Sequence, residues 1–246
     1  MIKLYRNNYP EINLYKKKSI KSGLVTQMIY GENFLILKRF DRWFKIRIKD
    51  DGYMGFIKKR DFFPYTKPTH KVSVLSANVY NAPNKKKIIN KLTFFSKIRI
   101  KESYKKFKRF DNGWIENKDI KPLNYKNKNI FSNIKIFKNV RYKWGGKTFK
   151  GLDCSALVQL FLNFNNRYCP RDTKDQEKYF KNNIKLKNIK KDNIIYWKGH
   201  VALIISNKKL IHAYGPLKKT VIMNTDQTIE QIKKTANLKI ISIKKI

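Results

Sequence analysis

The feature that most constrains the fold is a change of apolar pattern near residue 125. Upstream, apolar residues fall in short runs separated by turns, and Phe44, Ile46 and Ile48 alternate with polar residues. This period of two is typical of a half-buried strand, and the Asp51-Gly52 pair that follows predicts a hairpin turn. Downstream, apolar residues recur at helical spacing. We therefore expect an all-β part followed by a part that contains helices.

The all-β part is expected to hold two successive units of about 50 residues. The expected strands span 23–32, 34–39, 43–48 and 53–57 in the first unit, and 71–74, 78–80, 97–100 and 113–115 in the second. A tryptophan stands late in each unit. Such a repeat favours a tandem of small barrels, and both units resemble bacterial SH3-like domains. We assign residues 1–66 to the first barrel and 67–123 to the second.

The remaining residues, 124–246, are expected to form an α+β domain with helices first and an antiparallel sheet after them. The expected helices span 128–140 and 153–165, with a polar helix after Pro170, and the expected strands span 193–197, 201–205 and 210–214. The helix over 153–165 is apolar around most of its circumference. Such a helix is central and buried.

Cys154 stands at the start of this buried helix. The backbone N–H groups and the helix dipole at a helix N-terminus favour a thiolate, and Asp153 is suited to cap the helix. This position makes Cys154 a candidate nucleophile. The alternative is a small apolar side chain packed in the core, which is common for cysteine. Cys169 is expected to be such a core thiol.

Two of the chain's 3 histidines, His200 and His212, bracket one expected hairpin. If residues 206–208 form a three-residue loop, Ala202 faces His212 and His200 lies one diagonal step away, at roughly 7–8 Å between backbones. This spacing permits a general base oriented by a second ring. The alternative is two ordinary half-exposed histidines, since a register shift of one residue would separate the rings. The chain has no CxxC or HExxH motif, so we expect no metal and no cofactor.

Four blocks of sequence together resemble the NlpC/p60 family of papain-like peptidases, which cut bacterial cell-wall peptides. The blocks span 142–147, 151–159, 199–204 and 210–213, and the stretch 170–173 with Gln176 resembles a further family motif. The resemblance implies a catalytic domain of that type over 124–246. It also implies that Cys154 is the nucleophile, His200 the general base and His212 the polar third member.

SH3-like units ahead of such a domain resemble the γ-D-glutamyl-L-diamino acid endopeptidases. The resemblance implies hydrolysis of the γ-D-glutamyl–diamino acid bond in murein peptides with a free N-terminal L-Ala, in peptide recycling. It also implies that the first barrel closes one end of the substrate cleft. The implied substrate-binding residues are Asp153, Ser155, Tyr142, Trp144, Tyr53 and Glu32. For Asp153 the alternative is a helix cap alone, and for Ser155 and Tyr142 it is polar packing.

The formal net charge is +40, from 57 Lys and Arg against 17 Asp and Glu. An excess of this size fits either a polyanionic partner or a general drift of surface positions towards Lys, Asn and Ile. Because the lysines are spread along the whole chain, we expect drift and no specific nucleic-acid partner. The rival hypothesis is a basic binding module in which the cations of residues 99–109 are interleaved with Tyr104, Phe107 and Phe110. A further alternative is an amidase or acyltransferase of the same papain-like fold.

Two cysteines are too few for a disulfide scaffold. The first 18 residues hold no apolar run that could serve as the core of a signal peptide, and no stretch approaches the length of a membrane span. These features predict a cytoplasmic protein with no membrane partner.

Overall fold

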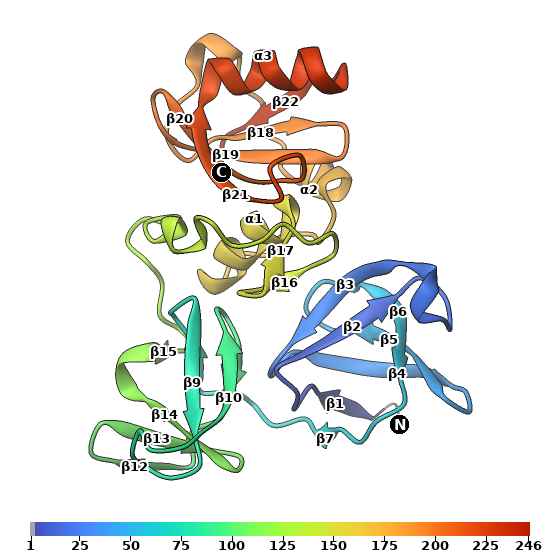
Figure 1. Cartoon of the computed structure of the whole chain (residues 1–246), viewed down its shortest axis with the longest axis vertical. Coiled ribbons are helices and arrows are strands. Elements are labelled where there is room, and N and C mark those ends of the chain that lie inside the picture. Colours follow the sequence, from blue (N-terminus) through green and yellow to red (C-terminus); the bar gives the residue numbers. More distant parts are fainter. Residues whose placement is uncertain (1–2) are drawn as a thin grey trace. The chain divides into compact units, whose positions relative to one another are not determined.

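The computed structural model describes residues 3–246, which form two compact units (Figure 1). Unit 1 holds the chain up to Tyr125 together with Lys147–Phe149, and unit 2 holds Lys126–Gly146 and Lys150–Ile246. The division falls close to the expected start of the catalytic domain at residue 124. The boundary expected between residues 66 and 67 lies inside unit 1 and stays a prediction.

The first part of unit 1 is a sheet with the strand order β3-β2-β6-β5-β4-β1-β7 in the described residues. Its strands are β1 (Leu4–Arg6), β2 (Glu11–Tyr15), β3 (Leu24–Ile29), β4 (Asn33–Arg39), β5 (Trp43–Ile48), β6 (Met54–Lys58) and β7 (Phe63–Pro64), with a 3-10 helix at Ile20–Ser22. The alternating residues Phe44, Ile46 and Ile48 are all buried in its core. The predicted turn is confirmed, because Gly52 has a φ of 74° and its N–H donates to the carbonyl of Ile48.

The second part of unit 1 holds two sheets, with the orders β10-β9-β14-β13-β12 and β11-β8-β15. The strands are β8 (His70–Val72), β9 (Ser76–Tyr80), β10 (Ile88–Thr93), β11 (Lys97–Ile98), β12 (Glu102–Tyr104), β13 (Phe107–Phe110), β14 (Gly113–Glu116) and β15 (Ile120–Pro122), with a 3-10 helix at Asn117–Asp119. The short strand β16 (Lys147–Thr148) also belongs to unit 1. Tyr30, which follows β3, packs into the core of this second part.

Unit 2 is built on an antiparallel sheet with the order β21-β20-β19-β18-β22. Its elements are β17 (Gly151–Leu152), α1 (Cys154–Phe164), α2 (Thr173–Tyr179), β18 (Ile194–Trp197), β19 (His200–Ser206), β20 (Lys209–Tyr214), β21 (Lys219–Asn224), α3 (Thr225–Ala236) and β22 (Ile240–Lys244), with 3-10 helices at Ile134–Phe137 and Leu186–Asn188. Helix α1 packs against β19 and β20, and α3 packs against β21. The expected order of helices before sheet is confirmed for α1 and α2, whereas the sequence pattern did not predict β21, α3 and β22.

Helix α1 begins where the sequence predicted. The Asp153 carboxylate accepts the backbone N–H of Ala156 at 2.8 Å, which satisfies one of the free donors of the first turn. Every residue of α1 except Asn163 is buried. The cap determines where this helix begins, and its apolar circumference explains why it is buried.

The helix predicted over 128–140 is wrong, because only Ile134–Phe137 is helical there, as a 3-10 turn. Asparagine side chains compete with the helix for backbone donors in this stretch. The Asn129 side chain accepts the N–H of Phe131 at 2.9 Å, and Asn133, which precedes the turn, makes no capping hydrogen bond. Local bonds of this kind hold the chain in turns although Ile130, Phe131, Ile134 and Phe137 have helical spacing.

The longest helix in the described part of the chain, α3, has 12 residues. A bilayer span needs about 20, and none of the helices formed by residues 3–246 is long and apolar enough to cross a membrane. The cytoplasmic location expected from the sequence stays a prediction.

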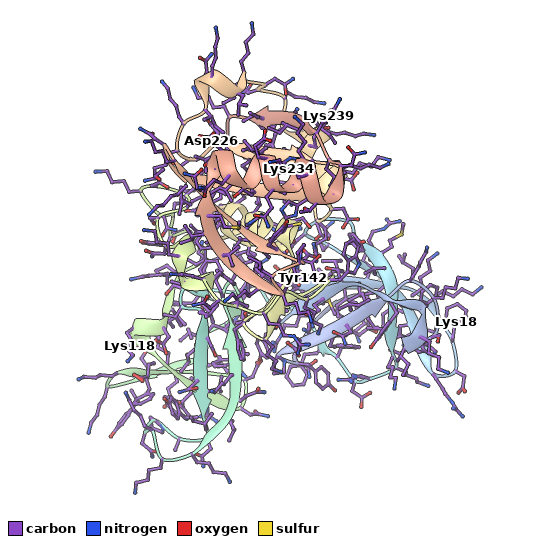
Figure 2. The ribbon with its side chains drawn as sticks, turned by 45° about the horizontal axis from the view of Figure 1, so that its top comes forward. Lys18, Lys118, Tyr142, Asp226, Lys234 and Lys239 are labelled. Carbon is purple, nitrogen blue, oxygen red and sulfur yellow. The ribbon has the colours of Figure 1, made fainter. Side chains whose placement is uncertain are left out.

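Lysine side chains extend from every part of the chain (Figure 2). Lys18, Lys118 and Lys234, which lie in three different regions of the sequence, are all exposed. In the second part of unit 1, Phe107 and Phe110 are buried and only Tyr104 of the three interleaved aromatics is exposed, at 47%. Buried rings cannot stack on nucleic-acid bases, so only Tyr104 of these three aromatics is placed to do so, and the expected lack of a specific nucleic-acid partner stays a prediction.

Candidate active site

Cys154 is the first residue of α1, and the residue is 5% exposed. The sulfur is within hydrogen-bonding reach of the backbone N–H of Val201 and of the hydroxyl of Thr173. Val201 is in β19, directly after His200, and Thr173 is the first residue of α2. Cys154, the predicted nucleophile, therefore contacts β19 at the residue next to His200, the predicted base.

Burial raises the pKa of the Cys154 thiol to about 11, and the charge of Asp153 adds to the rise. The Val201 N–H, the Thr173 hydroxyl and the charge of Arg171 act in the opposite direction, because each stabilises a thiolate. The helix N-terminus alone predicts a thiolate, but removal of the sulfur from water outweighs it here. Cys154 therefore carries a neutral thiol at pH 7, and its predicted role as nucleophile would require a base.

His200 and His212 are brought together as the diagonal spacing predicted. Nε2 of His200 and Nδ1 of His212 are 2.8 Å apart, and the ring centroids are separated by 5.0 Å. The loop itself differs from the prediction, because Ser206 pairs with Lys209 and only two residues remain in the turn. The pairing of β19 with β20 is irregular between Ile204 and Ser206, and this irregularity offsets the shorter turn. Beyond it the two strands have the expected register, in which Ala202 lies opposite His212.

Both imidazoles are neutral at pH 7. Burial lowers the pKa of His200 to about 4, and burial together with the neighbouring His200 lowers the pKa of His212 to about 3. Aromatic rings provide the apolar surroundings, since Trp197 lies 5.7 Å from the His200 ring and Tyr214 stacks on the His212 ring at 4.6 Å. A neutral His200 is free to accept a proton.

Nδ1 of His200 is the ring nitrogen that does not face His212. No hydrogen bond joins it to the Cys154 sulfur among the described residues. In free enzymes such catalytic hydrogen bonds are often long and tighten when substrate binds. Because the Cys154 sulfur contacts the backbone of Val201, the residue directly after His200, His200 is the candidate base for Cys154, and this role stays a prediction.

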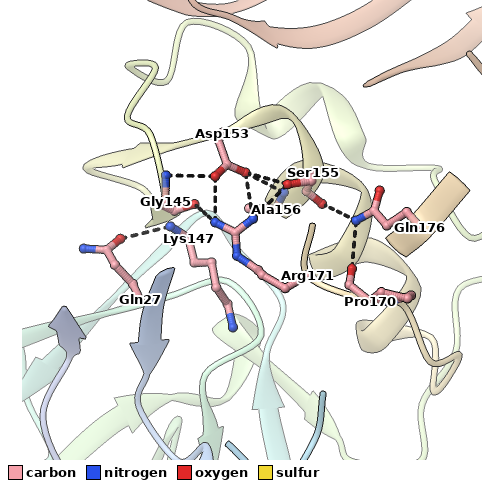
Figure 3. Close-up of polar contacts among 10 residues, drawn as sticks. Gln27, Gly145, Lys147, Asp153, Ser155, Ala156, Pro170, Arg171 and Gln176 are labelled. Carbon is pink, nitrogen blue, oxygen red and sulfur yellow. Dashed lines mark hydrogen bonds and ion pairs between the residues drawn. The ribbon is translucent and has the colours of Figure 1, made fainter. Parts of the chain in front are cut away.

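A buried polar network surrounds the residues on either side of Cys154 (Figure 3). Arg171, whose side chain is 1% exposed, donates to the two carboxylate oxygens of Asp153 at 2.9 and 2.7 Å. It also donates to the Ser155 hydroxyl at 2.8 Å, which in turn donates to Asp153 at 3.1 Å. The backbone N–H groups of Gly145 and Ala156 complete five hydrogen bonds to this one carboxylate. The network holds the start of α1 rigidly.

Sequence reasoning did not assign a role to Arg171, Thr173 or the Val201 amide. Arg171 and Thr173 lie in the 170–173 stretch, whose resemblance to a family motif does not by itself indicate what these side chains contact. Their partners are far away in the chain, as Arg171 and Asp153 are separated by 18 positions. Gln176 of α2 belongs to the same support, because its amide donates to the carbonyl oxygens of Ser155 and Pro170 at 2.9 Å each.

Tyr142 lies beside Cys154, since its backbone forms a bridge to Leu152 and its pKa responds to Cys154 and Asp153. Burial is the main cause that raises this pKa, and electrostatic interactions with Cys154 and Asp153 add to it. The phenol is thus a protonated donor at pH 7. Trp144, two residues further on, is 68% exposed. Contact of either residue with a substrate stays a prediction.

The two candidate residues of the first sheet lie in unit 1. Tyr53 is half-buried and packs at the edge of the core, while its N–H donates to the Asp51 side chain. The Glu32 carboxylate is 3% exposed, accepts the N–H of Ile29 and pairs with the ammonium group of Lys147 at 2.7 Å. Burial raises the pKa of Glu32, and Lys147 opposes that rise. The role of both residues in substrate binding stays a prediction.

Two segments of the chain match known protein families. Residues 139–237 match the NlpC/P60 family, and residues 14–62 match the bacterial dipeptidyl-peptidase SH3 domain. The first segment contains Cys154, His200 and His212, and the second contains most of the first sheet. Within residues 3–246, no group of three His, Cys, Asp or Glu side chains is arranged to hold a metal ion.

Curated relatives cover the chain to different extents. The γ-D-glutamyl-L-lysine dipeptidyl-peptidase of Bacillus subtilis (strain 168) is 27% identical over 229 residues, which is 83% of this chain and 77% of that protein. The murein DD-endopeptidase MepS/murein LD-carboxypeptidase of Escherichia coli (strain K12) is 32% identical over 85 residues, or 31% of this chain and 44% of that protein.

Two solved structures are similar over almost the whole chain. A crystal structure of an NlpC/P60 family protein from Bacillus cereus ATCC 10987 matches with a TM-score of 0.82 and 16% identity, over 98% of this chain and 99% of that one. An NlpC/P60 endopeptidase from Photobacterium damselae subsp. piscicida matches with a TM-score of 0.63 and 13% identity, over 98% and 70%. At these identities the likeness concerns the fold, which is an NlpC/P60 fold with an N-terminal SH3 domain.

Proposed function

Because the chain carries an NlpC/P60 domain behind a bacterial dipeptidyl-peptidase SH3 domain, we propose that it is a cysteine peptidase of bacterial cell-wall peptides. One observation carries the proposal: a buried thiol at the start of α1 meets β19 beside a hydrogen-bonded pair of neutral histidines. A neutral thiol next to a neutral imidazole is suited to general-base activation.

In the proposed reaction, Nδ1 of His200 takes the thiol proton as the Cys154 sulfur attacks the carbonyl carbon of the scissile amide. The tetrahedral intermediate collapses with cleavage of the C–N bond, and His200 returns the proton to the leaving amine. His200 then takes a proton from water, which attacks the thioester, and the free acid leaves with the thiol restored. The Tyr142 hydroxyl, kept protonated by its raised pKa, is the proposed donor to the oxyanion.

The proposed scissile bond joins γ-D-glutamate to the diamino acid of a murein peptide. Two similarities support this choice. The relative that aligns with most of this chain is named for a γ-D-glutamyl-L-lysine substrate, and the matched SH3 domain is named for bacterial dipeptidyl-peptidases. The diamino acid is L-Lys or diaminopimelate.

The finer part of the proposal is recognition of a free N-terminal L-Ala amine by Asp153 and Ser155. The Asp153 carboxylate already receives five hydrogen bonds, whereas a carboxylate offers about four lone-pair sites. An incoming ammonium group must therefore replace one donor. The Ser155 hydroxyl is the donor that can leave at least cost, because rotation about one bond turns its proton away while it still accepts from Arg171.

The test compares L-Ala-γ-D-Glu-diamino acid with the same peptide acetylated at its N-terminus, with products identified by mass spectrometry. We expect the wild type to release the diamino acid from the free peptide only. Asp153→Asn, which removes the charge but keeps a helix cap, should slow cleavage of the free peptide strongly. Equal cleavage of both peptides by the wild type would show a general endopeptidase and refute amine recognition.

A further inference from the structure

His212 has a second polar contact on the side away from His200. Its Nε2 lies 3.4 Å from the sulfur of Met223, and the His212 side chain is 0% exposed. Met223 is in β21, where Val221 stands opposite His212 in the strand pairing, so the sulfur reaches the ring from the diagonal position. The three side chains form a chain of contacts in the order His200, His212, Met223.

The positions of the protons in this row of contacts decide whether His200 can act as a base, because a neutral imidazole carries one N–H and one lone pair. In the first arrangement, His212 carries its proton on Nε2 and accepts the Nε2–H of His200 on Nδ1. The Nδ1 lone pair of His200 is then free to take the thiol proton. In the second, His212 carries its proton on Nδ1 and donates to Nε2 of His200. The proton of His200 must then be on Nδ1, where it prevents His200 from acting as the base.

The sulfur of Met223 favours one of the two arrangements. A methionine sulfur has no proton to give, so it can only accept from Nε2 of His212. In the first arrangement it accepts an N–H, whereas in the second two lone pairs face each other inside a buried site. We propose that Met223 is a positioning residue that holds His212 in the Nε2–H form and thereby leaves Nδ1 of His200 free as the base.

The far side of Met223 explains why a thioether is suited to this position. Met223 is half-buried and also lines a surface cavity of about 420 Å³, together with Lys135, Lys138 and Lys209. A smaller or hydroxyl-bearing side chain would bring water or an O–H group to Nε2 of His212, and either could donate a proton and favour the wrong tautomer. A thioether fills the space and cannot donate.

The test uses two substitutions with opposite chemistry. Met223→Leu keeps an apolar side chain of similar size but removes the acceptor. Met223→Glu supplies a carboxylate, which the three lysines of the cavity keep ionised, so that it also only accepts. Ile222→Leu is the matched control, because Ile222 is the neighbouring residue of β21 and lines the same cavity.

The first readout is the tautomer of His212 from the ¹⁵N chemical shifts of its ring, which are tractable in a chain with only 3 histidines. The second is the rate of iodoacetamide reaction with Cys154 at pH 7. The wild type should show the Nε2–H form. In Met223→Leu the Nδ1–H form should appear and alkylation should slow by about two- to tenfold, the effect of one net hydrogen bond. Met223→Glu should restore both readouts, and Ile222→Leu should leave them unchanged.

Three outcomes would overturn the proposal: a wild-type His212 in the Nδ1–H form, a Leu variant with unaltered tautomer, or a Glu variant as slow as the Leu variant. A Leu variant with a lower melting temperature and slower alkylation, but with the wild-type tautomer, would assign Met223 to packing alone. The inference rests on the proposed function, since it takes His200 as the base. Neither readout requires a murein peptide, so a protein that passes both but cleaves no such peptide would refute the proposed function only.

Discussion

Removal of Arg171 should damage unit 2 more than any single surface change, because it leaves the Asp153 carboxylate charged and buried. The Arg171 side chain is 1% exposed and that of Asp153 is 10% exposed, with 2.7 Å between the paired atoms. Loss of one partner from a buried ion pair costs about 3–5 kcal/mol. The whole stability of a domain is about 5–15 kcal/mol, so Arg171→Met should remove a large part of it.

The assay is urea unfolding followed by circular dichroism at 222 nm. All three α-helices formed by residues 3–246 belong to unit 2, so this signal reports unit 2. For a denaturant slope of about 2 kcal/mol per molar, a loss of about 3–5 kcal/mol moves the midpoint down by about 1.5–2.5 M urea. Arg167→Met is the matched control, because Arg167 is exposed and should change stability by less than about 0.5 kcal/mol.

The double variant Asp153→Asn with Arg171→Met separates the unpaired charge from lost packing. Asparagine keeps the cap and removes the charge, so the double variant should be more stable than Arg171→Met alone. A midpoint for Arg171→Met within about 0.5 M of the wild type would refute the reasoning. A double variant no better than the single one would show that the buried charge is not the cause.

Further predictions concern chemistry and charge. The acidic limb of the pH profile of kcat/KM should lie below pH 6.5 and towards 4. Burial lowers the pKa of His200 to about 4, so its unprotonated form persists as the pH falls. A limb at pH 6.5 or above would contradict a resting state in which Cys154 and His200 are both neutral. Iodoacetamide should abolish turnover through Cys154 whereas EDTA should not; loss in EDTA that zinc restores would replace the cysteine mechanism. Changing Lys105, Lys106 and Lys108 together to Glu should alter peptide hydrolysis by less than about threefold, since these side chains are exposed or half-buried and surface charges are screened by salt. The wild type should bind DNA with a Kd no tighter than roughly 10⁻⁶ M at physiological salt, the non-specific range; tight binding that the same triple variant abolishes would identify a polyanion site.

The parts of the fold that the sequence predicts well are those in which local pattern and tertiary environment agree. Phe44, Ile46 and Ile48 alternate and are buried, and the capped apolar helix at Cys154 is α1. Helix α3 was not foreseen because its pattern is mostly polar, and Ile232 is its only apolar residue that is fully buried. Its position depends on packing against β21, which periodicity alone does not reveal.

The site shows the same division. The diagonal of His200 and His212 could be predicted because it depends only on the pairing of two neighbouring strands. The Arg171–Asp153 pair and the Met223 contact could not, since each joins side chains from elements whose packing follows from the whole fold. The pKa of Cys154 was also beyond the sequence argument, because burial outweighs the local helix terminus.

The central claim is that Cys154 cleaves the γ-D-glutamyl–diamino acid bond, and product analysis of wild type and Cys154→Ser tests it most directly. L-Ala-γ-D-Glu-diamino acid is incubated with each protein, and the products are identified by mass spectrometry. The account predicts that the wild type yields L-Ala-D-Glu, with its γ-carboxyl group free, and the free diamino acid. The folded serine variant should yield neither, because an alcohol in place of the thiol is a poor nucleophile beside this histidine. Cleavage by Cys154→Ser at more than a few per cent of the wild-type rate, or a wild type that leaves the peptide intact, would contradict the account.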